Sequence, residues 1–212
     1  MITTRSLSRL AENGDAEAQF RLGYRYAFCR DQHRRDWKRA FAFWKESAEQ
    51  GHVRAQFYLG TCYDLERGVR KDARLAMHWY RIAAAAGHET AQYNLALGYR
   101  DGIGVSQNPQ AAARWFRAAA KGGYPDAQNY FGYCLHEGLG VRRDRRQAAR
   151  WYIRAAKKGV LHAEFNLGLC YLHGDGVARS IRNARKWLER AARRQHRRAR
   201  ELLSEPRPAT RR

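Results

Sequence analysis

A period of 36 residues runs through most of this 212-residue chain and restricts the folds open to it. A glycine-containing turn, DGIGVSQN from Asp101, returns as EGLGVRRD from Glu137 and as GDGVARS from Gly174, with a shorter form, ERGVRKD, from Glu66. Alanine holds one position in each block, at Ala55, Ala91, Ala127, Ala163 and Ala199. A fixed spacing of this length is the signature of stacked repeats, so the chain is predicted to be a repeat protein.

Each block has the pattern of two helices. In the block from 52 to 87, Ala55, Leu59 and Tyr63 recur at four-residue steps, which places them on one helix face. A second helix carries an alanine followed by a pair of large side chains. The pairs are Phe43-Trp44, Trp79-Tyr80, Trp115-Phe116, Trp151-Tyr152 and Trp187-Leu188. We expect the tryptophans of these pairs to fill the core between neighbouring helices.

The ends of the second helix are marked by capping residues. We expect N-caps at Asp72, Asn108, Asp144 and Ser180. We expect the helix to stop at Gly51, Gly87, Gly123 and Gly159, since glycine tolerates the positive φ of a helix C-terminus. The paired glycines of the turn are explained in the same way, as the end of the first helix before the chain reverses. The turns are therefore not predicted to bind phosphate, and no cofactor is expected.

The segment AQYNLALGYRDGIGVSQNPQAAARWFRAAAKGG, with its equivalents at 55–87, 127–159 and 163–195, resembles the Sel-1-like repeat, a relative of the tetratricopeptide repeat. The resemblance implies an all-α, right-handed α-solenoid of stacked antiparallel helix pairs, whose members mostly scaffold protein complexes. Five repeats are expected at 15–51, 52–87, 88–123, 124–159 and 160–195. Capping helices are expected at 1–14 and 196–204, followed by a flexible basic tail at 205–212. The first repeat departs from the family pattern, because AFCRDQHRRD contains no turn glycine.

The first helix of each repeat is predicted to line a concave groove that takes up a peptide or partner domain. Two columns of side chains should face it, and aromatic anchors there could carry binding energy. The first column is Phe20, Phe57, Tyr93, Asn129 and Phe165. The second is Tyr24, Thr61, Leu97, Tyr133 and Leu169. The alternative is that these columns pack between repeats, as apolar stripes at helical spacing usually do.

Positive charge is concentrated at the C-terminal end. The formal net charge is +21, and residues 141–212 contribute +15 of it, with 21 basic and 6 acidic side chains. Two ridges run at four-residue steps along the second helices of repeats 4 and 5. They comprise Arg146, Arg150, Arg154 and Lys158, then Arg182, Lys186, Arg190 and Arg194. They are either a solvated convex face or a surface for nucleic acid or another anionic partner.

The sequence shows no catalytic or metal-binding motif. Cys62, Cys134 and Cys170 occupy one repeat column, too far apart for a shared tetrahedral zinc site. No serine or cysteine stands in a nucleophile motif. With neither a signal peptide nor a long apolar run, the expected location is the cytoplasm. The sequence thus predicts a non-enzymatic, cytoplasmic scaffold or adaptor for a protein partner, with nucleic-acid or anionic-surface binding as the alternative.

Overall fold

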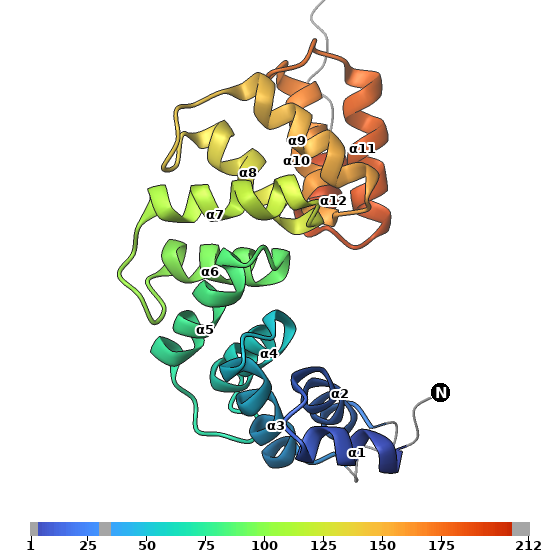
Figure 1. Cartoon of the computed structure of the whole chain (residues 1–212). Helices are drawn as coiled ribbons and strands as arrows, with labels where there is room; N and C mark the ends of the chain where they lie inside the picture. Colours follow the sequence, from blue (N-terminus) through green and yellow to red (C-terminus); the bar gives the residue numbers. More distant parts are fainter. Residues whose placement is uncertain (1–3, 30–34, 205–212) are drawn as a thin grey trace, which may run out of the picture. The chain divides into compact units, whose positions relative to one another are not determined.

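The computed structural model describes residues 4–29 and 35–204, which form twelve α-helices and no strand (Figure 1). In repeats 1, 2, 4 and 5 the first helix packs on the second, and the second helices of repeats 1, 2 and 4 also pack on the first helix of the next repeat. The predicted all-α solenoid of antiparallel helix pairs is confirmed. No helix in these residues is long and apolar enough to cross a membrane.

The chain divides into two compact units, residues 1–115 and residues 116–212, with α7 (Pro109–Gly122) running across the boundary. The first unit holds α1 (Thr4–Glu12), α2 (Ala16–Ala27), α3 (Trp37–Glu49), α4 (Val53–Asp64), α5 (Ala73–Ala85) and α6 (Glu89–Asp101). The second holds α8 (Pro125–Glu137), α9 (Arg145–Lys157), α10 (Leu161–His173), α11 (Ile181–Arg193) and α12 (Arg197–Ser204). The expected basic tail at 205–212 and residues 30–34 of the AFCRDQHRRD turn lie outside the described residues.

The predicted caps are confirmed. Asp72 accepts hydrogen bonds from the backbone N–H groups of the first turn of α5, and Asp144 does the same for α9. Asn108 and Ser180 cap α7 and α11. Positive φ is found at all four predicted stop glycines and at both glycines of each GxG turn. The sequence therefore located these chain reversals correctly.

The expectation that the tryptophans fill the core is wrong for most of them. The buried member of each pair is the second one: Trp44, Tyr80, Phe116, Tyr152 and Leu188 are at most 4% exposed. Trp79, Trp115, Trp151 and Trp187 are only half-buried. The reason is helical geometry, because adjacent residues on a helix point about 100° apart and only one of the two can face the partner helix.

A glycine in the first helix makes room for the buried ring of the second. A Cβ atom added at Gly60 would lie 2.7 Å from the ring of Tyr80, and one added at Gly132 would lie 2.9 Å from the ring of Tyr152. These distances are shorter than van der Waals contact. The glycine at this position of the first helix therefore sets how closely the two helices of a repeat can approach.

Candidate functional site

The first predicted column is largely occupied by contacts between repeats. Phe20, Asn129 and Phe165 are buried, while Phe57 and Tyr93 are half-buried. The aromatic rings stack on a histidine at the start of the next repeat. The ring pairs are Phe20–His52, Phe57–His88 and Phe165–His196, with centroids 4.7, 4.5 and 4.3 Å apart. Most of this column is therefore interface between repeats rather than free groove.

These histidines also cap the helices that follow them. The Nδ1 atoms of His52, His88 and His196 accept hydrogen bonds from backbone N–H groups at 3.1, 3.2 and 3.3 Å. An acceptor nitrogen must be unprotonated, so each cap requires a neutral ring. Burial lowers the pKa of His88, and nearby Arg54 lowers it further. Burial, His162 and Arg198 likewise lower the pKa of His196. The sequence analysis missed this role, although histidine recurs at 52, 88 and 196.

The second predicted column is more accessible. Tyr24 and Tyr133 are 42% and 44% exposed, whereas Thr61, Leu97 and Leu169 are half-buried. Tyr24 belongs to a group of aromatic rings at the first two repeats, where its ring contacts Phe28 at a centroid distance of 4.6 Å and Tyr58 at 5.9 Å. Phe28 is 40% exposed. Exposed aromatic side chains beside a buried aromatic group are typical of binding surfaces.

A pocket of about 460 Å³ opens beside Tyr24, and we call it the N-terminal pocket. It is lined by Leu7, Glu17, Phe20, Arg21, Tyr24, Arg25 and Arg54. Helices α1, α2 and α4 supply these side chains, so two repeats and the N-terminal helix build it together. Tyr24 offers exposed apolar surface above the buried Leu7, and the guanidinium groups of Arg21, Arg25 and Arg54 complete the lining.

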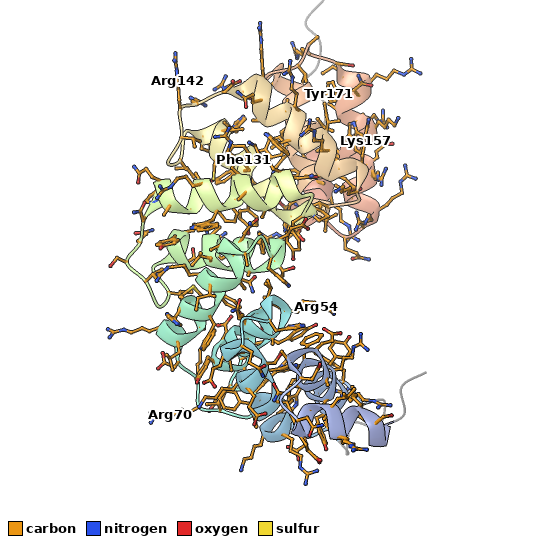
Figure 2. All side chains as sticks on the ribbon, in the orientation of Figure 1. Arg54, Arg70, Phe131, Arg142, Lys157 and Tyr171 are labelled. Atoms are coloured by element: carbon orange, nitrogen blue, oxygen red, sulfur yellow. The ribbon has the colours of Figure 1, made fainter. Side chains whose placement is uncertain are left out.

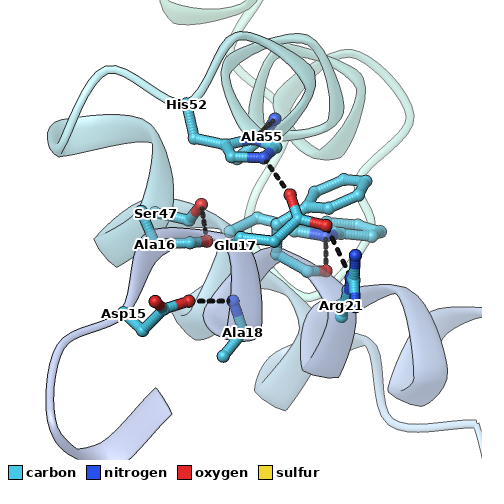
Figure 3. A network of polar contacts seen from close by, with 10 residues as sticks. Asp15, Ala16, Glu17, Ala18, Arg21, Ser47, His52 and Ala55 are labelled. Atoms are coloured by element: carbon cyan, nitrogen blue, oxygen red, sulfur yellow. Dashed lines mark hydrogen bonds and ion pairs between the residues drawn. The ribbon is translucent and has the colours of Figure 1, made fainter. Parts of the chain in front are cut away.

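Polar contacts hold one wall of this pocket in place, with Glu17 lying between His52 and Arg21 (Figure 3). The His52 Nε2–H donates to Glu17 Oε2 at 2.9 Å, and Arg21 Nε donates to Glu17 Oε1 at 2.5 Å. The hydrogen bond from His52 and the contact with Arg21 hold the pKa of Glu17 below its ordinary value. Glu17 is therefore ionised at neutral pH and neutralised by its own neighbours.

Two arginines of the pocket have no such partner. Arg54 lies in the first turn of α4 (Figure 2). Its guanidinium lies 4.6 Å from the centroid of the Phe20 ring. Arg25 lies in the last turn of α2. Within residues 4–29 and 35–204, neither forms an ion pair with a carboxylate. The pocket therefore carries uncompensated positive charge beside apolar surface.

All eight residues of the predicted basic ridges are exposed, but half of them have structural contacts. Lys158 donates to the carbonyl of Gly123, and Arg194 donates to that of Gly159, each at 2.6 Å. Arg154 lies over the ring of Trp151, 4.6 Å from its centroid. The remaining ridge residues, Arg146, Arg150, Arg182 and Lys186, have no ion pair in the described part of the chain.

Glu164 accounts for a fourth ridge residue, Arg190, and is a second partner of Arg194. Its side chain is fully buried, and its Oε1 atom lies 2.7 Å from Arg190 Nε and 3.2 Å from Arg194 Nη1. In the preceding repeats the same position is glutamine, at Gln19, Gln56, Gln92 and Gln128. Each donates to a backbone carbonyl of the helix before it, which for Gln19 is the N-terminal helix α1. The Gln-to-Glu change in an otherwise regular column was the sequence signal for this ion pair, and the sequence analysis missed it.

The cysteine column fits a structural role. Cys62, Cys134 and Cys170 are buried. Burial raises the pKa of Cys62 and of Cys170 to about 12, so these thiols are protonated and unreactive at neutral pH. Within the described residues, no three histidine, cysteine or acidic side chains are grouped so as to hold a metal ion.

Comparison with protein families matches the Sel1 repeat model five times, at residues 16–52, 53–88, 90–124, 125–160 and 161–196. Comparison with curated proteins gave no match.

Two solved structures are similar over nearly the whole chain. One is c5321, a protective antigen of uropathogenic Escherichia coli strains with an SLR fold, at 35% identity and a TM-score of 0.85. The other is a Sel1 repeat protein from Oxalobacter formigenes, at 33% identity and a TM-score of 0.80. They cover 92% and 93% of this chain, but the chain spans only 41% and 57% of their lengths.

Proposed function

Because the chain belongs to the Sel1 repeat family, whose members generally act in protein–protein interaction, we propose that it is a scaffold that binds a segment of a partner protein at the N-terminal pocket. The observation that carries this proposal is the exposure of Tyr24 beside the pocket. Anchors of this kind supply most of the binding energy of an interface.

The aromatic group behind Tyr24 favours this location. Tyr58 stacks on the buried Trp44 with ring centroids 4.7 Å apart, and Trp44 Nε1–H donates to the carbonyl of Phe20 at 3.2 Å. The exposed ring of Tyr24 thus adjoins a packed support, so little conformational entropy is lost when a partner covers it. A peptide side chain could enter the pocket while its backbone follows α2.

The proposal includes a non-enzymatic role. The Sel1 repeat is a non-catalytic interaction scaffold. The buried cysteines have raised pKa values, which does not favour nucleophilic chemistry. Cytoplasmic location remains part of the proposal and is supported by the four cysteines, which are all free thiols.

Nucleic-acid binding through the basic ridges gains no comparable support. Arg190 and Arg194 pair with Glu164, and Lys158 contacts a backbone carbonyl, so these charges have a role within the fold.

A selection experiment tests it. A random peptide library displayed on phage is selected against the immobilised chain, and the enriched peptides are titrated against wild-type protein and two variants. Tyr24→Ser should weaken binding at least about tenfold, because it removes an aromatic anchor. Tyr133→Ser is the matched control, since Tyr133 occupies the same repeat column with equal exposure.

Two results would overturn the proposal. One is a selection that enriches no peptide able to bind in solution. The other is equal loss of affinity in the Tyr24 and Tyr133 variants, which would show that the N-terminal pocket is not the preferred site. Circular dichroism of both variants separates loss of binding from loss of folding.

A further inference from the structure

The N-terminal pocket has a charge pattern that specifies its occupant more narrowly. Of its charged side chains, Arg21 and Glu17 neutralise each other, and His52 also bonds to Glu17. Arg25 and Arg54 remain without a carboxylate in the described residues. A site with two unpaired guanidinium groups favours a ligand that brings carboxylates.

Arg54 is oriented for such a ligand. Its guanidinium lies 4.6 Å from the centroid of the Phe20 ring, and this ring itself stacks on His52 at 4.7 Å. Stacking covers a face of the planar group and leaves its N–H edges available for hydrogen bonds. The fork of N–H donors matches the two oxygens of a carboxylate. Stacking on Phe20 therefore leaves the Arg54 guanidinium positioned to donate hydrogen bonds to an acidic side chain.

The apolar lining of the pocket favours a ligand that also brings an apolar side chain. Leu7, Phe20 and Tyr24 line the same pocket, and its volume of about 460 Å³ suits one large side chain with room for a neighbouring acidic group. A second copy of this chain is a poor occupant, since the chain carries a formal charge of +21 and would repel itself. Complementary charge points to an acidic partner instead.

We propose that the N-terminal pocket binds an acidic peptide segment in which an aromatic or aliphatic residue is flanked by aspartate or glutamate. The apolar side chain lies against the exposed ring of Tyr24, and carboxylates pair with Arg25 and Arg54. This inference rests on the proposed function and narrows it to one class of partner. A nucleic acid is a different occupant, and the oligonucleotide competitor in the test below distinguishes it from an acidic peptide.

The other end of the chain provides an internal control. In the second unit, Phe165 stacks on His196, and the guanidinium of Arg198 lies 5.6 Å from the Phe165 ring centroid. Arg198 occupies the repeat position of Arg54, but Asn166 and Leu169 stand where the first unit has Arg21 and Tyr24. Arg54 and Arg198 thus share local stacking while differing in their surroundings.

The test uses a fluorescein-labelled peptide with Glu-Asp-Phe-Glu-Asp at its centre and Gly-Ser flanks, titrated into the full chain by fluorescence anisotropy. Two further peptides replace the acids by amides or the phenylalanine by alanine. Each replacement should weaken binding at least about tenfold, since each removes one of the two required features.

Protein variants then locate the site. Arg25→Glu with Arg54→Glu should abolish binding of the acidic peptide, whereas Arg198→Glu should leave the affinity within about twofold of wild type. If the double reversal disturbs folding by circular dichroism, Arg25→Gln with Arg54→Gln replaces it and should weaken binding about tenfold.

Several results would overturn the inference. One is no binding of the acidic peptide, and another is equal affinity for the acidic and amide peptides. The others are equal loss of affinity in the double reversal of Arg25 and Arg54 and in Arg198→Glu, and displacement of the peptide by a single-stranded oligonucleotide of the same charge. If library peptides bind at Tyr24 but are not acidic, this inference fails and the proposed function stands. If no peptide binds at Tyr24, both fail.

Discussion

At the scale of single residues, the second member of each pair of large side chains is the one that packs in the core. Tyr152 is 2% exposed and lies against Gly132, whereas its neighbour Trp151 is half-buried and contacts Arg154. Tyr152→Ala should therefore lower the free energy of unfolding by about 3–5 kcal/mol, as for other large core side chains. Trp151→Ala should cost only about 1–2 kcal/mol, in proportion to the area that it buries.

Urea denaturation of these two variants checks that Tyr152→Ala lowers the free energy of unfolding more than Trp151→Ala does. A larger cost for Trp151→Ala would mean that the core face of α9 is assigned incorrectly. The sequence could locate the aromatic pair but not which member faces inward, because both fit a helical spacing and the choice depends on the angle at which α8 packs on α9.

The ion pairs of Glu164 give a second prediction at this scale. Replacing Arg190 and Arg194 together by leucine should destabilise the fold by about 3–5 kcal/mol, because a buried carboxylate loses both cations. Adding Glu164→Gln should recover most of this loss, because it removes the unpaired charge and restores the residue found in the other repeats. Urea denaturation measures the loss of unfolding free energy caused by the two arginine replacements, with and without Glu164→Gln. An equal loss in both cases would show that Glu164 does not depend on these arginines.

At the scale of helices, the cap at His88 makes stability depend on pH. The pKa of His88 is lowered from 6.5, so the unfolded chain takes up a proton before the folded one as pH falls. The stabilisation is present above pH 6.5 and is lost as pH falls below 6.5 towards the lower pKa of the folded state. His88→Asn, which caps a helix without titrating, should remove this contribution.

Unfolding free energies of wild type and His88→Asn, measured from pH 7.5 to pH 5, check this account. The wild type should lose about 0.5–2 kcal/mol relative to the variant over this range, which is the typical value of an N-cap. Parallel pH profiles would show that the ring of His88 is not a neutral cap. The sequence indicated the boundary of α6 but not its histidine cap, because serine, threonine, aspartate and asparagine are the usual residues there.

At the scale of the whole molecule, the period of 36 residues was enough to predict the fold. Each repeat contacts only its neighbours, so local spacing in the sequence specifies the helix pairs and their order. The candidate site was less predictable. Tyr24 was named from its column, but the N-terminal pocket also needs Leu7 from α1 and Arg54 from the next repeat, which no single column brings together. Bulk charge pointed instead to the C-terminal ridges, where Glu164 and backbone carbonyls already engage three of the cations.

The most direct test of the central claim, that the N-terminal pocket is the partner-binding site, is a hydrogen–deuterium exchange footprint. Exchange is compared for the chain alone and for the chain saturated with a library-selected peptide. Slower exchange should be confined to α1, α2 and the start of α4, since these elements line the pocket. Slower exchange along α9 and α11 instead, or no change at saturation, would contradict the claim.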